Sequence, residues 1–273
     1  MVIDFHTHMF PDAIAAKTIA HLEDNAKDDA SAHTNGTLQG LKDSMKANHI
    51  DYSVVLPIVT RPKQFDSINE FAAKINGTDG IISFGSIHPE NENIREKLEY
   101  IKSLGLKGVK LHPDYQNHFI DDAGYLEILR ACIDLDLICS IHAGYDIGIP
   151  YPIHCPPDRM RMVLDELLQD CNKDSKIVLA HMGGYLQWEL VEKCLAGQNV
   201  YLDMSFCKDV IDEAMLVRII KKHGSDRILY ATDSPWTDQG EMVEYVKNLP
   251  ISEDDKENIF YKNAVRLLEM VIE

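Results

Sequence analysis

Short apolar runs alternate with longer amphipathic segments along almost the whole chain. The short runs are rich in β-branched residues, which is typical of buried strands. Eight such runs occur, so we predict eight strands. They cover residues 2–8, 52–59, 81–87, 106–112, 137–142, 176–181, 200–206 and 228–233.

The segments between these runs repeat apolar residues every three or four positions, as one buried face of a helix does. The predicted helices are 65–75, 94–104, 124–135, 159–170, 186–195, 212–222 and 240–249. The first connection, residues 9–51, is the longest and has room for two helices. A closing helix is predicted over 253–272.

Strands that alternate with helices predict a parallel sheet, because each helix carries the chain back to the starting edge. Eight such units in 273 residues fit a (β/α)8 barrel, which needs about 250 residues. An open, doubly wound sheet is the alternative. No composition shift divides the chain, so we predict an α/β protein with one domain, a (β/α)8 TIM barrel over residues 1–273.

Charge and composition narrow the classes of partner. A net charge of -17 repels polyanions, so we expect no nucleic-acid partner. No apolar run approaches the roughly 20 residues of a membrane span, and Met1 leads into a predicted strand rather than a signal peptide. The six cysteines form no CxxC pair. We expect a cytoplasmic protein that acts on a small molecule; the sequence leaves open whether it forms a homo-oligomer.

Histidines gather where the predicted strands end. The chemistry of such barrels lies at the carboxyl ends of the strands. Six of the twelve histidines lie at or just past these ends, and an aspartate ends the eighth strand in the same way. These residues are His6, His8, His88, His112, His142, His181 and Asp233.

His6 and His8 carry the sharpest signal. Residues two apart in a strand point to the same face, so both imidazoles enter one space. Two neutral imidazoles held together suit Zn2+, Fe2+, Mn2+ or Ni2+. The alternative is a pair of solvated histidines at a strand end. The matching residues on later strands favour a metal site.

His142, His181 and Asp233 extend this pattern. Each histidine ends an apolar strand and precedes a glycine-containing turn, so each is a candidate metal ligand or acid–base group. A carboxylate buried in a barrel mouth needs a cation or donors to remain ionised. A helix N-cap is the alternative for Asp233, but Pro235 fits a loop better and favours a metal.

Further residues are candidates for substrate contacts. Lys110 and His112 share the inward face of the fourth strand and mark a candidate second-metal or substrate site. Lys110 could bind an anionic group, be carboxylated between two metals, or pair with a carboxylate. Candidate substrate-binding residues are Arg61, which could bind a carboxylate in bidentate fashion, Tyr145 in the loop 143–157, and Trp236, which could stack on a flat substrate. A structural role stays open for each of these three.

Five motifs together resemble the amidohydrolase superfamily. They are FHTH, GVKLHP, IHAG, LAHMGG and ATDSPW, on the first, fourth, fifth, sixth and eighth predicted strands. The similarity spans the barrel and looks closest to the amidohydrolase-2 group of TIM-barrel metal-dependent hydrolases. That group also contains nonhydrolytic decarboxylases similar to aminocarboxymuconate semialdehyde decarboxylase.

The resemblance implies a role for each matched residue. It makes His6, His8, His142 and Asp233 ligands of one divalent ion, for which we expect Zn2+. It makes His181 a catalytic acid–base or electrophilic group beside the metal. Lys110 matches the position of a carboxylated lysine in binuclear members, whereas His112-Pro113 is more typical of the mononuclear branch. A second metal therefore stays open.

Four functions follow as hypotheses. The first is a metal-dependent hydrolase that cleaves a small-molecule C–N or C–O bond through a metal-activated water, with Asp233 relaying a proton. The alternative is a metal-dependent nonhydrolytic decarboxylase of a small unsaturated or aromatic acid. A TatD-like nuclease is disfavoured by Lys110 and by the net charge of -17. A protein with a purely structural metal is disfavoured because such an ion needs no open position.

Overall fold

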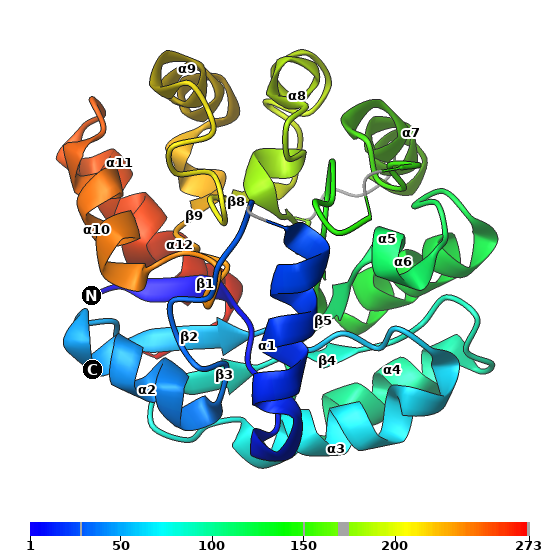
Figure 1. The fold of residues 1–273 in the computed structure, drawn as a ribbon. Helices are drawn as coiled ribbons and strands as arrows, with labels where there is room; N and C mark the ends of the chain where they lie inside the picture. The colour runs from blue at the N-terminus through cyan, green and yellow to red at the C-terminus, as the bar shows by residue number, and fades with distance from the viewer. Residues whose placement is uncertain (28, 150, 169–174, 272–273) are drawn as a thin grey trace.

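The parallel strands form a barrel with helices around it (Figure 1). A computed structural model describes residues 1–27, 29–149, 151–168 and 175–271. One sheet has the order β1 (Ile3–Thr7), β2 (Tyr52–Val55) and β3 (Ile81–Ser83). The other has the order β4 (Gly85–Ser86), β5 (Gly108–Leu111), β6 (Ile138–Ile141), β7 (Ile177–Leu179), β8 (Tyr201–Asp203) and β9 (Ile228–Leu229).

Backbone hydrogen bonds join the two sheets at both edges. Phe84 lies between β3 and β4, and its N–H donates to the Val55 carbonyl at 3.0 Å. At the other edge the Phe5 N–H donates to the Tyr230 carbonyl at 2.9 Å. The short strands β3 and β4 are thus two halves of the third barrel strand. The predicted (β/α)8 barrel is confirmed, and the open-sheet alternative is wrong.

In the described part of the chain the helices before the closing segment are α1 (Asp12–Ala26), α2 (Leu38–Ala47), α3 (Phe65–Ile75), α4 (Ile94–Ser103), α5 (Pro113–Gln116), α6 (Ala123–Leu135), α7 (Pro157–Leu168), α8 (Trp188–Cys194), α9 (Glu213–His223) and α10 (Gln239–Asn248). The seven helices with a predicted range agree with it to within two residues at each described end. The first connection holds α1 and α2, and the short helix α5 was not predicted. Single turns are η1 (Pro62–Gln64), η2 (His181–Gly183) and η3 (Ser225–Arg227). The last two residues of the predicted helix 159–170 lie outside the described residues.

The predicted closing helix is shorter than expected. It comprises α11 (Glu253–Glu257), the π-helical turn η4 (Asn258–Lys262) and α12 (Asn263–Leu267). Leu268 caps it, and residue 272 lies outside the described residues. Within the described residues no helix is both long enough and apolar enough to span a bilayer. The cysteines among them (132, 139, 155, 194 and 207) are free thiols, and Cys171 lies outside them.

A register shift in β1 aims the first histidine into the barrel. Ile3 and Phe5 belong to a cluster of apolar side chains that fills the barrel interior, so simple alternation would point His6 outward. The pairing of β1 with β2 is irregular between Asp4 and Thr7. Such a bulge re-aims the side chains that follow it. His6 consequently faces residues from the opposite wall of the barrel.

Asp4, before this irregularity, ties the barrel together on the helix side. Its fully buried carboxylate accepts hydrogen bonds from the Thr232 N–H at 3.0 Å and the Thr232 hydroxyl at 2.6 Å. It also accepts one from the Gln239 side chain at 2.7 Å. These bonds connect β1 to the segment after β9 and to α10, where the barrel closes.

Replacing Asp4 with alanine is expected to lower the free energy of unfolding by about 3–5 kcal/mol. The reason is that buried donors left without an acceptor cost about 1–3 kcal/mol each. Urea denaturation measures the change, with Asp43→Ala on the exposed side of α2 as the control. Equal unfolding midpoints for the two variants would show that the Asp4 network does not stabilise the closure.

Candidate metal centre

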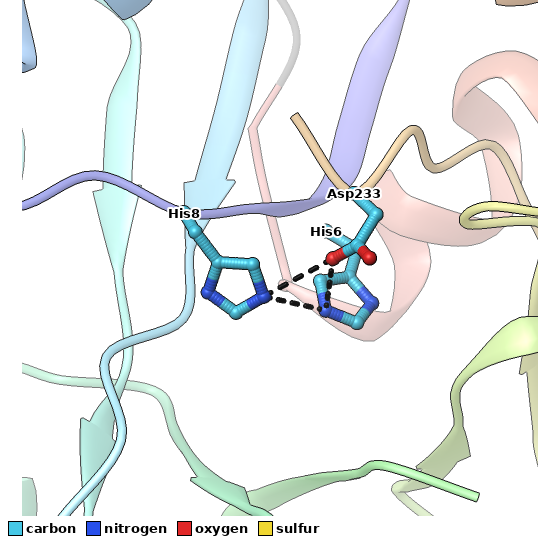
Figure 2. Close-up of side chains that lie close together, drawn as sticks. All are labelled: His6, His8 and Asp233. Atoms are coloured by element: carbon cyan, nitrogen blue, oxygen red, sulfur yellow. Dashed lines mark hydrogen bonds and ion pairs between the residues drawn. The ribbon is translucent and has the colours of Figure 1, made fainter. Parts of the chain in front are cut away.

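Three donor atoms converge at the carboxyl end of the barrel (Figure 2). His6 Nε2 lies 3.1 Å from His8 Nε2 and 3.2 Å from Asp233 Oδ1. His8 Nε2 lies 3.1 Å from the same Asp233 oxygen. His6 and His8 come from the end of β1, and Asp233 comes from the loop after β9. The structure thus brings together three of the four predicted ligands.

The hydrogen bonds of the two Nδ1 atoms determine that Nε2 of each imidazole faces the three-donor group. His6 Nδ1 lies 2.9 Å from an Asp203 carboxylate oxygen, and His8 Nδ1 lies 2.9 Å from the Leu56 carbonyl. Both partners are acceptors, so each Nδ1 carries a proton, and in the neutral ring each Nε2 presents a lone pair. Burial lowers the pKa of His6 to about 4, which keeps this ring neutral at neutral pH. Two lone pairs and a carboxylate oxygen therefore face one point, an arrangement that suits a cation.

The spacing of these atoms fits a transition-metal ion. In a tetrahedral site with metal–nitrogen bonds of about 2.0–2.1 Å, neighbouring donors lie about 3.3 Å apart. In a six-coordinate site with similar bonds they lie about 3.0 Å apart. The observed separations of 3.1–3.2 Å fall between these values. The donor set thus fits a divalent ion but does not select zinc over manganese.

Lys110 brings a positive charge to the same place. Its ammonium nitrogen lies 3.1 Å from His6 Nε2, and the side chain is only 1% exposed. Burial lowers the pKa of Lys110 to about 8, so most of the population is charged at neutral pH. Lys110 therefore adjoins the predicted ligand His6.

His142 and His181 form a neighbouring pair. His142 Nδ1 lies 3.0 Å from His181 Nε2, and the rings of His181 and His6 are 5.5 Å apart between centroids. His181 Nδ1 donates to the Ser205 carbonyl at 3.0 Å, so its Nε2 presents the lone pair in the neutral ring. Burial lowers the pKa of His181, which favours that neutral form.

His142 does not belong to the three-donor group, and its Nε2 is unusual. This atom is buried without a hydrogen-bond partner, 3.8 Å from Asp114 Oδ2 and 3.9 Å from Asp146 Oδ2. Asp114 Oδ2 is also buried and unpaired. His142 Nδ1 instead faces the Nε2 lone pair of the neutral His181 ring at 3.0 Å, and this contact is a hydrogen bond when His142 Nδ1 carries the proton. The ligand role that the resemblance implies for His142 stays a prediction.

His112 lies in a second donor group and also near Lys110, whose charge adds to burial in lowering the pKa of His112. Ligand atoms of His112, His142 and Asp146 lie within 4.8 Å of one another. The His112 ring stacks between Tyr115 and His142, with centroid separations of 4.0 Å and 4.1 Å. Burial, together with the neighbouring Asp114, raises the pKa of Asp146 to about 6. The stack holds the His142 ring in place.

A cavity of about 560 Å3 opens onto these groups. Tyr145 and Trp236, two of the predicted substrate contacts, line it together with Lys110. Arg61 does not: its side chain is exposed, although the nearby Thr60 and Gln64 line the wall. Because Arg61 does not line the cavity, we leave it out of the proposed site.

Asp203 is a site residue that the sequence analysis missed. It is fully buried at the end of β8 and accepts hydrogen bonds from His6 Nδ1 and from the His181 and Ser205 N–H groups. Burial alone would raise the pKa of Asp203, but the interaction with His6 outweighs it and lowers the pKa below its ordinary value. The sequence did contain a signal for Asp203. This residue ends the seventh barrel strand, just as Asp233 follows the eighth.

Replacing Asp203 with alanine is expected to weaken metal binding by about 10–100-fold. Partners that orient a metal-binding imidazole typically contribute that much, because they fix its tautomer and direction. Competition with a fluorescent chelator measures the affinity, and Asp24→Ala on the exposed side of α1 is the control. Unchanged affinity in the Asp203 variant would remove it from the site.

A comparison with protein-family models finds a match to the model described as Amidohydrolase over residues 3–270. No curated protein matches the chain in sequence.

Solved structures match over nearly the full length. An uncharacterised TIM-barrel protein from Bordetella bronchiseptica has a TM-score of 0.77 and 19% identity, covering 98% of both chains. The 5-carboxyvanillate decarboxylase from Sphingomonas paucimobilis has a TM-score of 0.69 and 16% identity, covering 99% of both chains. The corresponding enzyme from Novosphingobium aromaticivorans, complexed with manganese and 4-hydroxy-3-methoxy-5-nitrobenzoic acid, has a TM-score of 0.69 and 17% identity, covering 99% of this chain and 96% of that one. These similarities show the fold.

Proposed function

Because the chain belongs to the amidohydrolase family, we propose that it is a metal-dependent decarboxylase of a small aromatic or unsaturated acid. This choice reverses the order of the sequence-based hypotheses, in which hydrolysis came first. The similarity to two 5-carboxyvanillate decarboxylases supports it. Hydrolysis of a C–N or C–O bond remains the second candidate, because it would use the same metal ligands.

One observation carries the proposal: the metal centre opens into a cavity with aromatic walls. Tyr185, Phe206 and Trp236 line the cavity together with Lys110 and His181. Aromatic side chains suit a flat ring, which they contact through offset or edge-to-face packing. An apolar wall also disfavours a carboxylate relative to neutral CO2, so loss of the carboxyl group relieves an unfavourable burial.

The proposed reaction consumes one proton and no water. A proton adds to the ring carbon that bears the carboxylate. The C–C bond then breaks, its electron pair returns to the ring, and CO2 leaves. The divalent ion, when bound, would hold anionic oxygens of the acid and offset their charge.

The chain's own residues supply the remaining functions. Lys110, mostly cationic at neutral pH, is placed to bind an anionic oxygen of the acid. His181 has its Nδ1 proton held by the Ser205 carbonyl, so Nε2 is the atom that takes and gives a proton. Burial would raise the pKa of Asp233, but His6 and His8 outweigh it and lower the pKa, so the carboxylate is ionised and engages both imidazoles through Oδ1. Oδ2 is then an acceptor, and the proton relay through Asp233 stays a prediction. Tyr145 and Trp236 form part of the wall that holds the ring.

The identity of the ion is part of the proposal. Imidazole and carboxylate donors bind several divalent first-row metals, including zinc and manganese. We retain zinc as the specific prediction, and the manganese bound to the similar Novosphingobium aromaticivorans enzyme makes manganese the alternative.

Product analysis in D2O separates the two candidate reactions. The metal-loaded protein is incubated with hydroxybenzoic acids and, separately, with esters and amides of similar size. We expect CO2 in a one-to-one ratio with the phenol, and one deuterium at the carbon that lost the carboxyl group. Release of alcohol or amine without CO2 would contradict the proposal and favour the hydrolase.

A further inference from the structure

The cavity extends beyond the barrel mouth. In β2 and the residue after it, Val54 and Leu56 pack inside the barrel, whereas Val55 packs on the helix side. Val55 nevertheless lines the cavity, as does Ile75 at the end of α3. The cavity therefore passes over the rim of β2 and continues outside the barrel wall. We call this extension, lined by residues of α1 and α3 and by Val55, the outer arm.

Helix α1 forms one wall of the outer arm. In Figure 1 this helix extends from the middle of the barrel toward α3. Its residues Ile14, Thr18 and Leu22 line the cavity, and they recur at every fourth position along one stripe. Ala15 and Ile19, on the adjacent stripe, are buried. α1 thus turns a second stripe toward the cavity, in which Ile14 and Leu22 are apolar and the Thr18 hydroxyl is bonded to the Ile14 carbonyl. Ile14 is still 49% exposed.

Helix α3 forms the facing wall. Ile68, Phe71 and Ile75 recur at spacings of three and four and line the same cavity. Ile68 and Phe71 are only partly buried. Two helices thus turn partly exposed apolar side chains toward one space, a costly arrangement unless something apolar covers them.

Charge is segregated along the cavity. The ionisable lining groups, such as Lys110, Asp146 and Asp233, lie at the metal end. Among the described residues of α1 and α3 that line the outer arm, none is charged. The complementary ligand has an anionic group at one end and an apolar body at the other.

The volume supports the same conclusion. A cavity of roughly 150 Å3 is enough for benzene. The cavity here is about 560 Å3, which leaves most of the space unfilled by a single ring with a carboxylate. Cavities of roughly 300–1,000 Å3 typically bind larger organic ligands.

We propose that the substrate is an aromatic or unsaturated acid with an extended apolar substituent, and that this substituent lies in the outer arm between α1 and α3. The inference rests on the proposed decarboxylase function for the acid group. Continuity of the arm with the metal centre identifies its occupant as part of the substrate, because one molecule can fill both. Ile68, Phe71 and Leu22 then determine specificity for the substituent.

Hydroxybenzoic acids with methyl, propyl and hexyl chains test the proposal. Burial of each CH2 strengthens binding by up to roughly fourfold. We therefore expect kcat/KM for CO2 release to rise at least about tenfold from the methyl to the hexyl acid. Calorimetry on the same acids gives their affinity, independent of turnover, and should show the same trend.

Variants with a blocked arm provide the second readout. Ile68→Trp should lower the preference for the hexyl over the methyl acid at least about tenfold, in kcat/KM and in affinity. Leu22→Trp, on the opposite wall, should have the same effect. It keeps the test decisive if Ile68→Trp fails to fold. Glu70→Trp places the same ring on the exposed side of α3 and should leave the preference unchanged.

The outcomes distinguish this inference from the proposed function. CO2 release that is equally efficient for all chain lengths would overturn the outer-arm inference and leave the decarboxylase intact. If no acid releases CO2, the proposed function fails. The affinities measured by calorimetry then test the outer-arm inference by themselves. Affinity that rises with chain length and falls in Ile68→Trp supports the arm, whereas affinity independent of chain length overturns it.

Discussion

The His6→Ala variant is expected to lose its bound divalent ion and to turn over substrate at least about a thousandfold more slowly than the wild type. Nε2 of His6 contacts both other donors of the three-atom group and Lys110, so its removal breaks the group at its centre. A metal that offsets transition-state charge contributes several kcal/mol, and each 1.36 kcal/mol is about tenfold in rate. Elemental analysis of the purified protein and CO2 release measure the two losses.

A second variant and a control make this result specific. Asp233→Ala should lose the metal in the same way, because Asp233 Oδ1 faces both imidazoles. His21→Ala removes an exposed imidazole from α1 and should keep both metal and activity. Stoichiometric metal in His6→Ala and Asp233→Ala would show that these residues do not hold the ion.

The His181→Ala variant is expected to retain the metal and to lose turnover by about 10²–10⁴-fold. That range is typical when a positioned acid–base group is removed. The imidazole of His181 is fixed by Ser205 at one nitrogen and turns the other toward His142, beside the three-donor group. Metal content and kcat are measured on the same preparation.

His33→Ala is the control for this variant, because His33 is exposed. Wild-type turnover in His181→Ala would assign His181 to packing. Loss of the metal together with turnover would instead make His181 a ligand, and the assignment of roles within the His142–His181 pair would be wrong.

Much of the fold followed from patterns that one strand or helix carries by itself. Alternating apolar runs and amphipathic segments located all eight barrel strands, and α3 spans Phe65–Ile75 as predicted. The convergence of His6, His8 and Asp233 was also predictable, because parallel strands bring their carboxyl ends to one rim. These features depend on local periodicity and on the direction of the strands.

Other features depend on register across the barrel and could not be predicted from one segment. The irregular pairing between Asp4 and Thr7 aims His6 inward, and the partner of His6 Nδ1 is Asp203, 197 residues away. Arg61 was predicted to contact the substrate because it follows a strand. The turn Pro62–Gln64 instead leaves its side chain exposed. A residue's distance along the chain from a strand end does not fix the direction of its side chain.

The sequence motifs also could not decide between hydrolysis and decarboxylation. Both reactions would use the same imidazoles and carboxylate, so the histidine pattern cannot separate them. The shape and polarity of the cavity, which depend on α1, α3 and the loops, bear on that choice. The sequence does not show that the first connection places α1 along the wall of the cavity.

Anomalous X-ray scattering from a metal-loaded crystal tests the metal centre most directly. We predict a strong peak within about 2.0–2.3 Å of His6 Nε2, His8 Nε2 and Asp233 Oδ1, with His142 Nδ1 as the fourth ligand to be examined. A fully loaded protein with its peak elsewhere, or with no peak bonded to those three atoms, would contradict the account.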